Sequence, residues 1–132
     1  MDCIFCDASK TNVTNSRSRG YVIWRRRQCS QCGSVWTTRE TVDYSTSHRI
    51  SNTSSEQLRP LQRDDILFMI RDSLQHRKDA ESAASELTDT VLSKVLALHL
   101  SNISRKDLHR KIVETLKAYD PTAAAVFKAK NN

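Results

Sequence analysis

The sequence of 132 residues contains few of the residues that interrupt regular structure, with only two glycines and two prolines. It also lacks a long apolar run, since no uninterrupted one is longer than that from Ile66 to Ile70. A membrane-spanning helix needs about 20 apolar residues, and a secretory leader needs a charged start followed by about 7 to 15 of them. We therefore expect no membrane span, no signal peptide and a location in the cytoplasm, associated with the nucleoid.

Recognisable catalytic arrangements are also missing. The sequence shows no nucleophile paired with a base, no metal site with an open position and no pair of carboxylates at a catalytic spacing. We therefore expect a protein that is not an enzyme, with no catalytic residues and no residues that bind an organic cofactor.

All four cysteines lie in the first 32 residues, as two C-x-x-C pairs separated by 22 residues. In a reducing compartment such pairs indicate metal ligands before disulfides. Two residues between ligands let both sulfurs reach one tetrahedral ion at about 2.3 Å, and four thiolates close the coordination shell. The spacing predicts one structural Zn²⁺ ion per chain, with iron in a rubredoxin-like site as the alternative. The predicted ligands are Cys3, Cys6, Cys29 and Cys32.

The segment that carries the cysteines has the features of a small metal-stapled β module. A module of about forty residues buries too little apolar surface to fold without a metal, a disulfide or a partner. Gly33 follows Cys32, where a metal knuckle needs a residue that accepts positive φ, and Asp7 occupies the matching place after Cys6. Runs rich in Val, Ile, Thr and aromatic residues predict three strands, at Asn12–Asn15, Tyr21–Arg26 and Val35–Val42.

Positive charge is concentrated in the same segment. The whole chain has a formal net charge of +6, and residues 1–40 carry seven Lys or Arg against three acids, a balance of +4. A strand from Tyr21 to Arg27 would place Arg25 and Arg27 on one face and Arg26 with Trp24 on the other. The planar guanidinium suits both phosphates and base edges. We predict contacts to double-stranded DNA from Arg17, Arg19, Arg25, Arg26 and Arg27, the alternatives being a merely solvated strand or a protein partner such as RNA polymerase.

Three aromatic residues of this segment have two possible roles. Phe5, Trp24 and Trp36 are suited to stacking on bases, but a module with so little core more often uses such residues for packing. We favour packing.

The rest of the chain has helical periodicity after a polar stretch. Residues 44–59 are interpreted as a linker because Ser, Thr, Asn and His dominate most of that stretch. Apolar positions then repeat every three or four residues and predict about four helices, at Gln62–Arg77, at Ser82–Leu100, from Ser104 onward and from Asp120 onward. The predicted fold is α+β, with a zinc ribbon at residues 1–43 built on a three-stranded antiparallel sheet, the linker, and an all-helical domain at 60–132.

The front segment resembles the NrdR family of bacterial transcriptional repressors, which join a zinc ribbon to an ATP-cone domain. The family patterns C-P-F-C, D-S-R, I-R-R-R-R-x-C-x-x-C and R-F-T-T-x-E are echoed at residues 3–6, 15–17, 23–32 and 35–40. The resemblance covers nearly all of residues 1–42 and implies operator binding through Arg17 and the run Arg25 to Arg27. Trp24 stands where the family has its first arginine.

The C-terminal part of the chain resembles an ATP-cone domain, but more loosely than the N-terminal part resembles the zinc ribbon. Residues 60–65 echo the family's P-F-D-R-E-K, and residues 116–123 echo L-K-x-L-D-x-V-A. The family's V-V-K-R-x-G, whose basic residues hold nucleotide phosphates, corresponds to the stretch Ser51–Glu56, and a later lysine is replaced by Asp65. We expect a degenerate cone that no longer binds ATP or dATP and that serves assembly.

These observations favour a zinc-dependent DNA-binding transcription regulator that works as a homodimer or a larger homo-oligomer. The alternative is a protein-interaction module that docks on RNA polymerase or on a second regulator. A working nucleotide sensor is a third possibility, which would need cations that the aligned stretch lacks.

Overall fold

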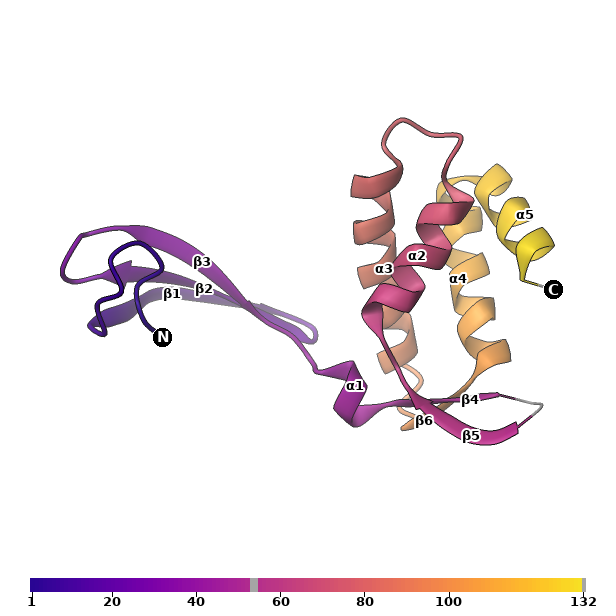
Figure 1. Cartoon of the computed structure of the whole chain (residues 1–132), viewed down its shortest axis with the longest axis horizontal. Helices are drawn as coiled ribbons and strands as arrows, with labels where there is room; N and C mark the ends of the chain where they lie inside the picture. The colour runs from indigo at the N-terminus through magenta and orange to yellow at the C-terminus, as the bar shows by residue number, and fades with distance from the viewer. Residues whose placement is uncertain (53–54, 132) are drawn as a thin grey trace. The chain divides into compact units, whose positions relative to one another are not determined.

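The computed structural model describes residues 1–52 and 55–131, and the side chains of Ser55 and Glu56 also lie outside the description. The chain divides into two compact units, Met1–Val42 and Asp43–Asn132 (Figure 1). The first unit is a three-stranded antiparallel sheet and the second is mostly helical. The predicted α+β class and the order of its parts are confirmed.

The first unit consists of β1 (Thr11–Arg19), β2 (Val22–Cys29) and β3 (Val35–Glu40), hydrogen-bonded in the order β1-β2-β3. The first two strands are longer than the sequence predicts, because antiparallel pairing from Thr11↔Cys29 to Arg19↔Val22 continues through polar residues. The register shifts once, between Val13 and Asn15. This long ribbon presents two faces, and few of its side chains are buried.

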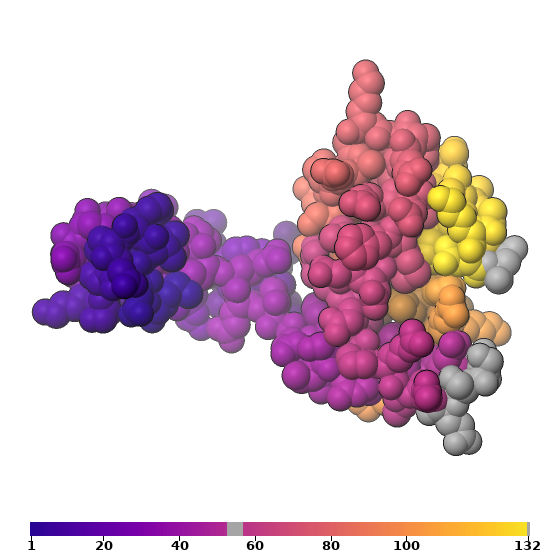
Figure 2. All heavy atoms as spheres, in the orientation of Figure 1, coloured from indigo at the N-terminus to yellow at the C-terminus, as the bar shows by residue number. Residues whose placement is uncertain are grey.

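Four long helices build the second unit: α2 (Arg63–Ser73), α3 (Ala80–Leu96), α4 (Arg105–Tyr119) and α5 (Pro121–Lys130). The predicted caps are present, since the Ser104 hydroxyl accepts the Asp107 N–H at 3.0 Å and Asp120 Oδ1 accepts the Thr122 N–H at 2.9 Å. One continuous apolar core joins the helices, and in Figure 2 α5, in yellow, lies directly against α2. Its largest fully buried side chains are Phe127, Leu61, Ile66, Ile70, Leu74, Leu92, Ile103, Ile112 and Leu116.

The stretch 44–59, interpreted from its composition as a linker, instead forms α1 (Tyr44–Ser47), β4 (Arg49–Asn52) and most of β5 (Ser55–Pro60). With β6 (Asn102–Ser104) these strands form a second small sheet, in the order β5-β4-β6, in which β4 and β6 run parallel. Ile50 packs against the helical core beside the buried Ile103, its pairing partner. The linker interpretation and the prediction of an all-helical domain at residues 60–132 are both corrected accordingly, because β6 lies within that domain and its backbone pairing organises residues whose side chains carry little β pattern.

A polar cluster joins the α2–α3 connection to the end of α4. Arg77 Nε lies 2.8 Å from Asp79 Oδ1, and the Tyr119 hydroxyl donates to Asp79 Oδ2 at 2.7 Å. His76 Nε2 lies 2.8 Å from Asp120 Oδ2, on the carboxylate that caps α5. Arg77, followed by Tyr119, holds the pKa of Asp79 at about 2, and His76 is the main cause of a lowered pKa at Asp120.

These lowered pKa values predict acid sensitivity of the helical unit. Because both carboxylates bind protons less readily when folded, their stabilisation is present above their ordinary pKa of about 4 and is lost as the pH falls, in the case of Asp79 through about 2. Thermal unfolding followed by far-UV circular dichroism should show this loss. Asp79→Asn should flatten the pH dependence across that interval, and an unchanged dependence in this variant would exclude Asp79 as a contributor.

Candidate metal centre and nucleic-acid surface

The two C-x-x-C pairs fold into matching knuckles. In the first, the Asp7 N–H donates to the Cys3 carbonyl at 3.0 Å, and in the second the Gly33 N–H donates to the Cys29 carbonyl at the same distance. Both residues have positive φ, 64° at Asp7 and 76° at Gly33, as the sequence predicts. Glycine and aspartate tolerate this backbone region better than most residues. Each knuckle therefore turns its two sulfurs toward the same point.

The four sulfurs form a cluster of the size that one zinc ion needs. Cys3 Sγ lies 3.7 Å from Cys32 Sγ, and Cys6 Sγ lies 3.6 Å from Cys29 Sγ. All four lie within 4.8 Å of one another. Zn–S bonds of about 2.3 Å in a tetrahedron require sulfurs separated by about 3.8 Å. The cluster is a site for one structural zinc ion, and the four predicted ligands are confirmed.

Local hydrogen bonds favour the thiolate form of two of these ligands. The backbone N–H groups of Cys32 and Gln31 point at Cys29 Sγ, at 3.4 and 3.3 Å, and lower the pKa of Cys29. The Ser34 side chain, followed by its backbone N–H, brings the pKa of Cys32 to about 6. Zinc binds thiolates and releases their protons, so these bonds favour the form of Cys29 and Cys32 that binds the metal, whereas burial and the neighbouring cysteines raise the pKa of Cys6.

The only apolar cluster found in the described part of the first unit surrounds the metal ligands. Cys3, Cys29 and Trp36 are buried together, and Phe5 meets Trp36 edge-on with ring centroids 6.3 Å apart. Trp36 therefore packs, as favoured from the sequence. Trp24 is 36% exposed, and the packing interpretation does not hold for it.

The sheet divides the predicted DNA-binding arginines between two faces. The Arg25 face carries Arg25, which pairs with Glu40 at 3.4 Å, and Arg27, which donates to the Thr38 hydroxyl at 3.2 Å. Cys29 and Trp36 lie on this face as well, because they keep the same alternation along β2 and β3. The metal centre therefore occupies one end of the Arg25 face.

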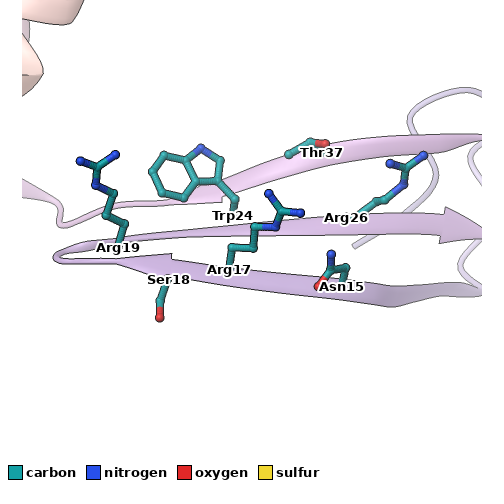
Figure 3. Close-up of a pocket in the computed structure, with 7 residues that line it drawn as sticks. All are labelled: Asn15, Arg17, Ser18, Arg19, Trp24, Arg26 and Thr37. Carbon is teal, nitrogen blue, oxygen red and sulfur yellow. The ribbon is translucent and has the colours of Figure 1, made fainter.

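The opposite face, named the Trp24 face, carries Trp24 with the other three predicted arginines. Pairing sets Arg17 beside Trp24, Asn15 beside Arg26 and Arg26 beside Thr37. Figure 3 shows Arg17, Arg19, Trp24 and Arg26 projecting to the same side, with Ser18 pointing away. A shallow hollow of about 620 Å³ lies over this face. Arg25 and Arg27 thus lie on one face of the sheet and Arg26 on the other, as side-chain alternation along the strand predicts.

A second hollow, of about 270 Å³, lies in the helical unit beneath the β4–β5 hairpin. Asp65, the residue that replaces a family lysine, lines it. Arg59 and Arg105 also line this hollow, and the sequence did not predict either of them as a site residue. For Arg105 one signal was present in the sequence, because it directly follows Ser104, the predicted cap of α4. Burial, followed by the charge of Arg105, lowers the pKa of His109 in the same lining.

The stretch Ser51–Glu56, which corresponds to the family's phosphate-binding V-V-K-R-x-G, is described only in part. Ser51 and Asn52 belong to β4, whereas Thr53 and Ser54 lie outside the described residues.

The metal centre predicts a selective effect of losing one ligand. Cys29→Ser should unfold the ribbon and leave the second unit folded, because zinc supplies about 10 to 16 kcal/mol to such modules and the helical core is separate. Metal analysis should find one zinc per wild-type chain and none in the variant. Ser30→Ala, in the same knuckle, is the matched control and should keep its zinc. Zinc retained by Cys29→Ser would contradict the assigned ligand set.

Comparison with known proteins gives the same assignment as the geometry. The family model of the N-terminal domain of NrdR-like transcriptional repressors, a zinc ribbon, matches residues 1–40. The chain is 31% identical over 129 residues to the transcriptional repressor NrdR of Neorickettsia sennetsu, an alignment that covers 96% of this chain and 85% of the relative. It is 30% identical over 135 residues to the NrdR repressor of Leifsonia xyli, covering 98% and 83%.

These relatives are named as transcriptional repressors, a non-enzymatic class, in agreement with the prediction that the chain is not an enzyme. Among the described residues, no helix combines the length and the apolar character needed to cross a membrane. A zinc ribbon matched by the family's own model, together with this identity over nearly the whole chain, shows that the chain belongs to the NrdR family of transcriptional repressors.

Proposed function

We propose that this chain is a zinc-dependent transcription regulator that binds operator DNA with its ribbon, in the cytoplasm and in association with the nucleoid. The observation that carries this proposal is an arginine-rich, largely exposed sheet on a zinc ribbon that matches the family model over residues 1–40. Arg17, Arg19 and Arg26 are exposed, and Arg25 and Arg27 are half-buried. The direct contacts with DNA are proposed to come from among these five arginines.

The electrostatics of the ribbon support a polyanionic partner. Residues 1–40 have seven basic and three acidic side chains, whereas a DNA duplex carries one negative charge per about 1.7 Å of its axis. Two thiolate charges remain after four cysteines bind one zinc ion, but these sit at the metal centre and not on the Trp24 face. Release of counterions from the phosphates would then supply much of the binding free energy.

The regulator is proposed to act as a homodimer or a larger homo-oligomer. A single small module buries only about 600 to 1,000 Å² on DNA, so two or more ribbons are needed for a specific complex. The second unit exposes apolar side chains that assembly could cover, among them Phe68 at 50% and Leu100 at 48% exposure.

We further propose that the cone does not sense ATP or dATP. The hollow beneath the hairpin, at about 270 Å³, lies below the usual range of about 300 to 1,000 Å³ for ligand pockets. The Asp65 carboxylate would repel a phosphate there, and each charge-assisted contact that is lost costs about 1.5 to 3 kcal/mol. Arg59 and Arg105 line the same hollow and would attract a phosphate, so the proposal rests on the small volume of the hollow and on the exchange of the family's lysine for Asp65.

Isothermal titration of the zinc-loaded protein with ATP and with dATP should therefore give no measurable heat. Asp65→Lys is the matched variant, because it restores the cation of the family pattern and should only improve phosphate binding. Micromolar affinity of the wild-type chain for either nucleotide would show that the site is functional and that the proposed degeneration is wrong.

DNA binding should weaken steeply as the salt concentration rises. If three arginines of each ribbon meet phosphates, the logarithm of the binding constant should fall with a slope of about −2 to −3 per ribbon against the logarithm of salt concentration. Fluorescence anisotropy on a preferred duplex and on a scrambled duplex measures both the slope and the preference. Equal, weak binding to both would favour the alternative function, docking on RNA polymerase or a second regulator.

A further inference from the structure

The two faces of the ribbon's sheet differ in how much of their charge is already neutralised. On the Arg25 face, Arg25 donates to Glu40 and to the Ser16 hydroxyl at 3.2 Å, and Arg27 donates to Thr38. On the Trp24 face, the structure shows no ion pair between any described residue and the side chain of Arg17, Arg19 or Arg26. A guanidinium without a counter-charge keeps its full attraction for an external anion.

The faces also differ in what covers them. The buried Cys3, Cys29 and Trp36 occupy the metal end of the Arg25 face, so that part of it is the module's own core. Arg17, Arg19 and Arg26 on the Trp24 face are exposed, whereas Arg25 and Arg27 on the opposite face are half-buried. The Trp24 face is therefore the more accessible of the two.

The hollow over the Trp24 face has the chemistry of a nucleic-acid contact. Its lining contains three guanidiniums, one indole and short polar side chains, and no carboxylate. The lining residues are Asn15, Arg17, Ser18, Arg19, Trp24, Arg26 and Thr37 (Figure 3). Guanidiniums recognise phosphate oxygens and base edges, and the amide and hydroxyl groups suit either.

Trp24 is central to this arrangement. Its pairing partner on β1 is Arg17, and directly paired residues on one face have Cβ atoms about 4.5 to 5.5 Å apart. On the same strand, Arg26 lies two positions further along on the same face. The indole therefore lies beside Arg17 and next to Arg26 on one face, where a duplex that reached both arginines would also cover the ring.

We infer that the Trp24 face is the surface that meets the DNA duplex, with Arg17, Arg19 and Arg26 on phosphates or base edges and Trp24 packed against sugars or bases between them. This inference rests on the proposed DNA-binding function. Arg25 and Arg27 are then positioning residues, which hold β2 to β3 through Glu40 and Thr38 and make no direct contact with DNA.

The test uses the zinc-loaded full chain and the duplex that sequence selection recovers with it. Arg26→Ala and Arg17→Ala should each weaken binding about 5- to 100-fold, and a residue on a phosphate should also lower the salt slope by about one. Arg25→Ala is the matched control on the same strand and should stay within about twofold, because it removes an internal ion pair with Glu40 and no contact with DNA. Zinc content and the thermal unfolding of each variant verify that the ribbon is intact.

Trp24 gives an independent readout. Trp24→Ala should weaken binding about fivefold or more without changing the salt slope, because it removes an uncharged contact. Trp24→Arg should raise the slope by about one, because it adds a phosphate contact. Acrylamide quenching reports mainly on Trp24, which is 36% exposed against 9% for Trp36, and DNA should protect it.

Two outcomes would overturn the inference, and they differ in what they leave standing. If Arg25→Ala and Arg27→Ala weaken binding while the Trp24-face variants do not, the duplex meets the Arg25 face and the proposed function survives. If all of these variants bind as tightly as the wild type, the ribbon does not contact the DNA, and the proposed mode of binding fails as well.

Discussion

Coordination of one zinc ion by four cysteines is the interaction on which the first unit depends. The ribbon's apolar cluster comprises little beyond Cys3, Cys29 and Trp36, which is far too small to offset the conformational entropy of some forty residues. The two knuckles join the N-terminal segment to the β2–β3 connection, and β1, β2 and β3 extend from that junction. The metal therefore anchors one end of the sheet, and side-chain alternation along β2 determines which of its arginines share a face.

Side chains alternate between the two faces along β2, so that one set of residues serves folding and the other set is left to bind a partner. Cys29 and Arg27 lie on the face that contains the metal and the internal pairs, whereas Trp24 and Arg26 lie on the face that contains no such core. A short strand thus serves folding with one set of side chains and leaves the other set for a partner. The helical unit has an independent core and a polar cluster of its own around Arg77, so its stability does not depend on the metal.

Features fixed by local chemistry were predictable from the sequence. The spacing of the cysteines, the positive φ at Asp7 and Gly33, and the caps at Ser104 and Asp120 are confirmed because each depends on neighbouring residues. The β4–β6 pairing was not predictable, since it joins Ile50 to Ile103, which lie far apart in the sequence, and it does so through backbone groups. The partners of Arg25 and the lining of the hollow near Arg105 likewise require the register and packing of separate segments.

Selection of DNA duplexes from a random library by the zinc-loaded protein is the most direct test of a ribbon that reads DNA, with Cys29→Ser in parallel. The wild-type chain should enrich one sequence motif, and the variant, which retains its helical unit but lacks the metal-stapled ribbon, should enrich none. Failure of the wild-type chain to enrich any motif, or enrichment of the same motif by the variant, would contradict the assignment of DNA recognition to the ribbon.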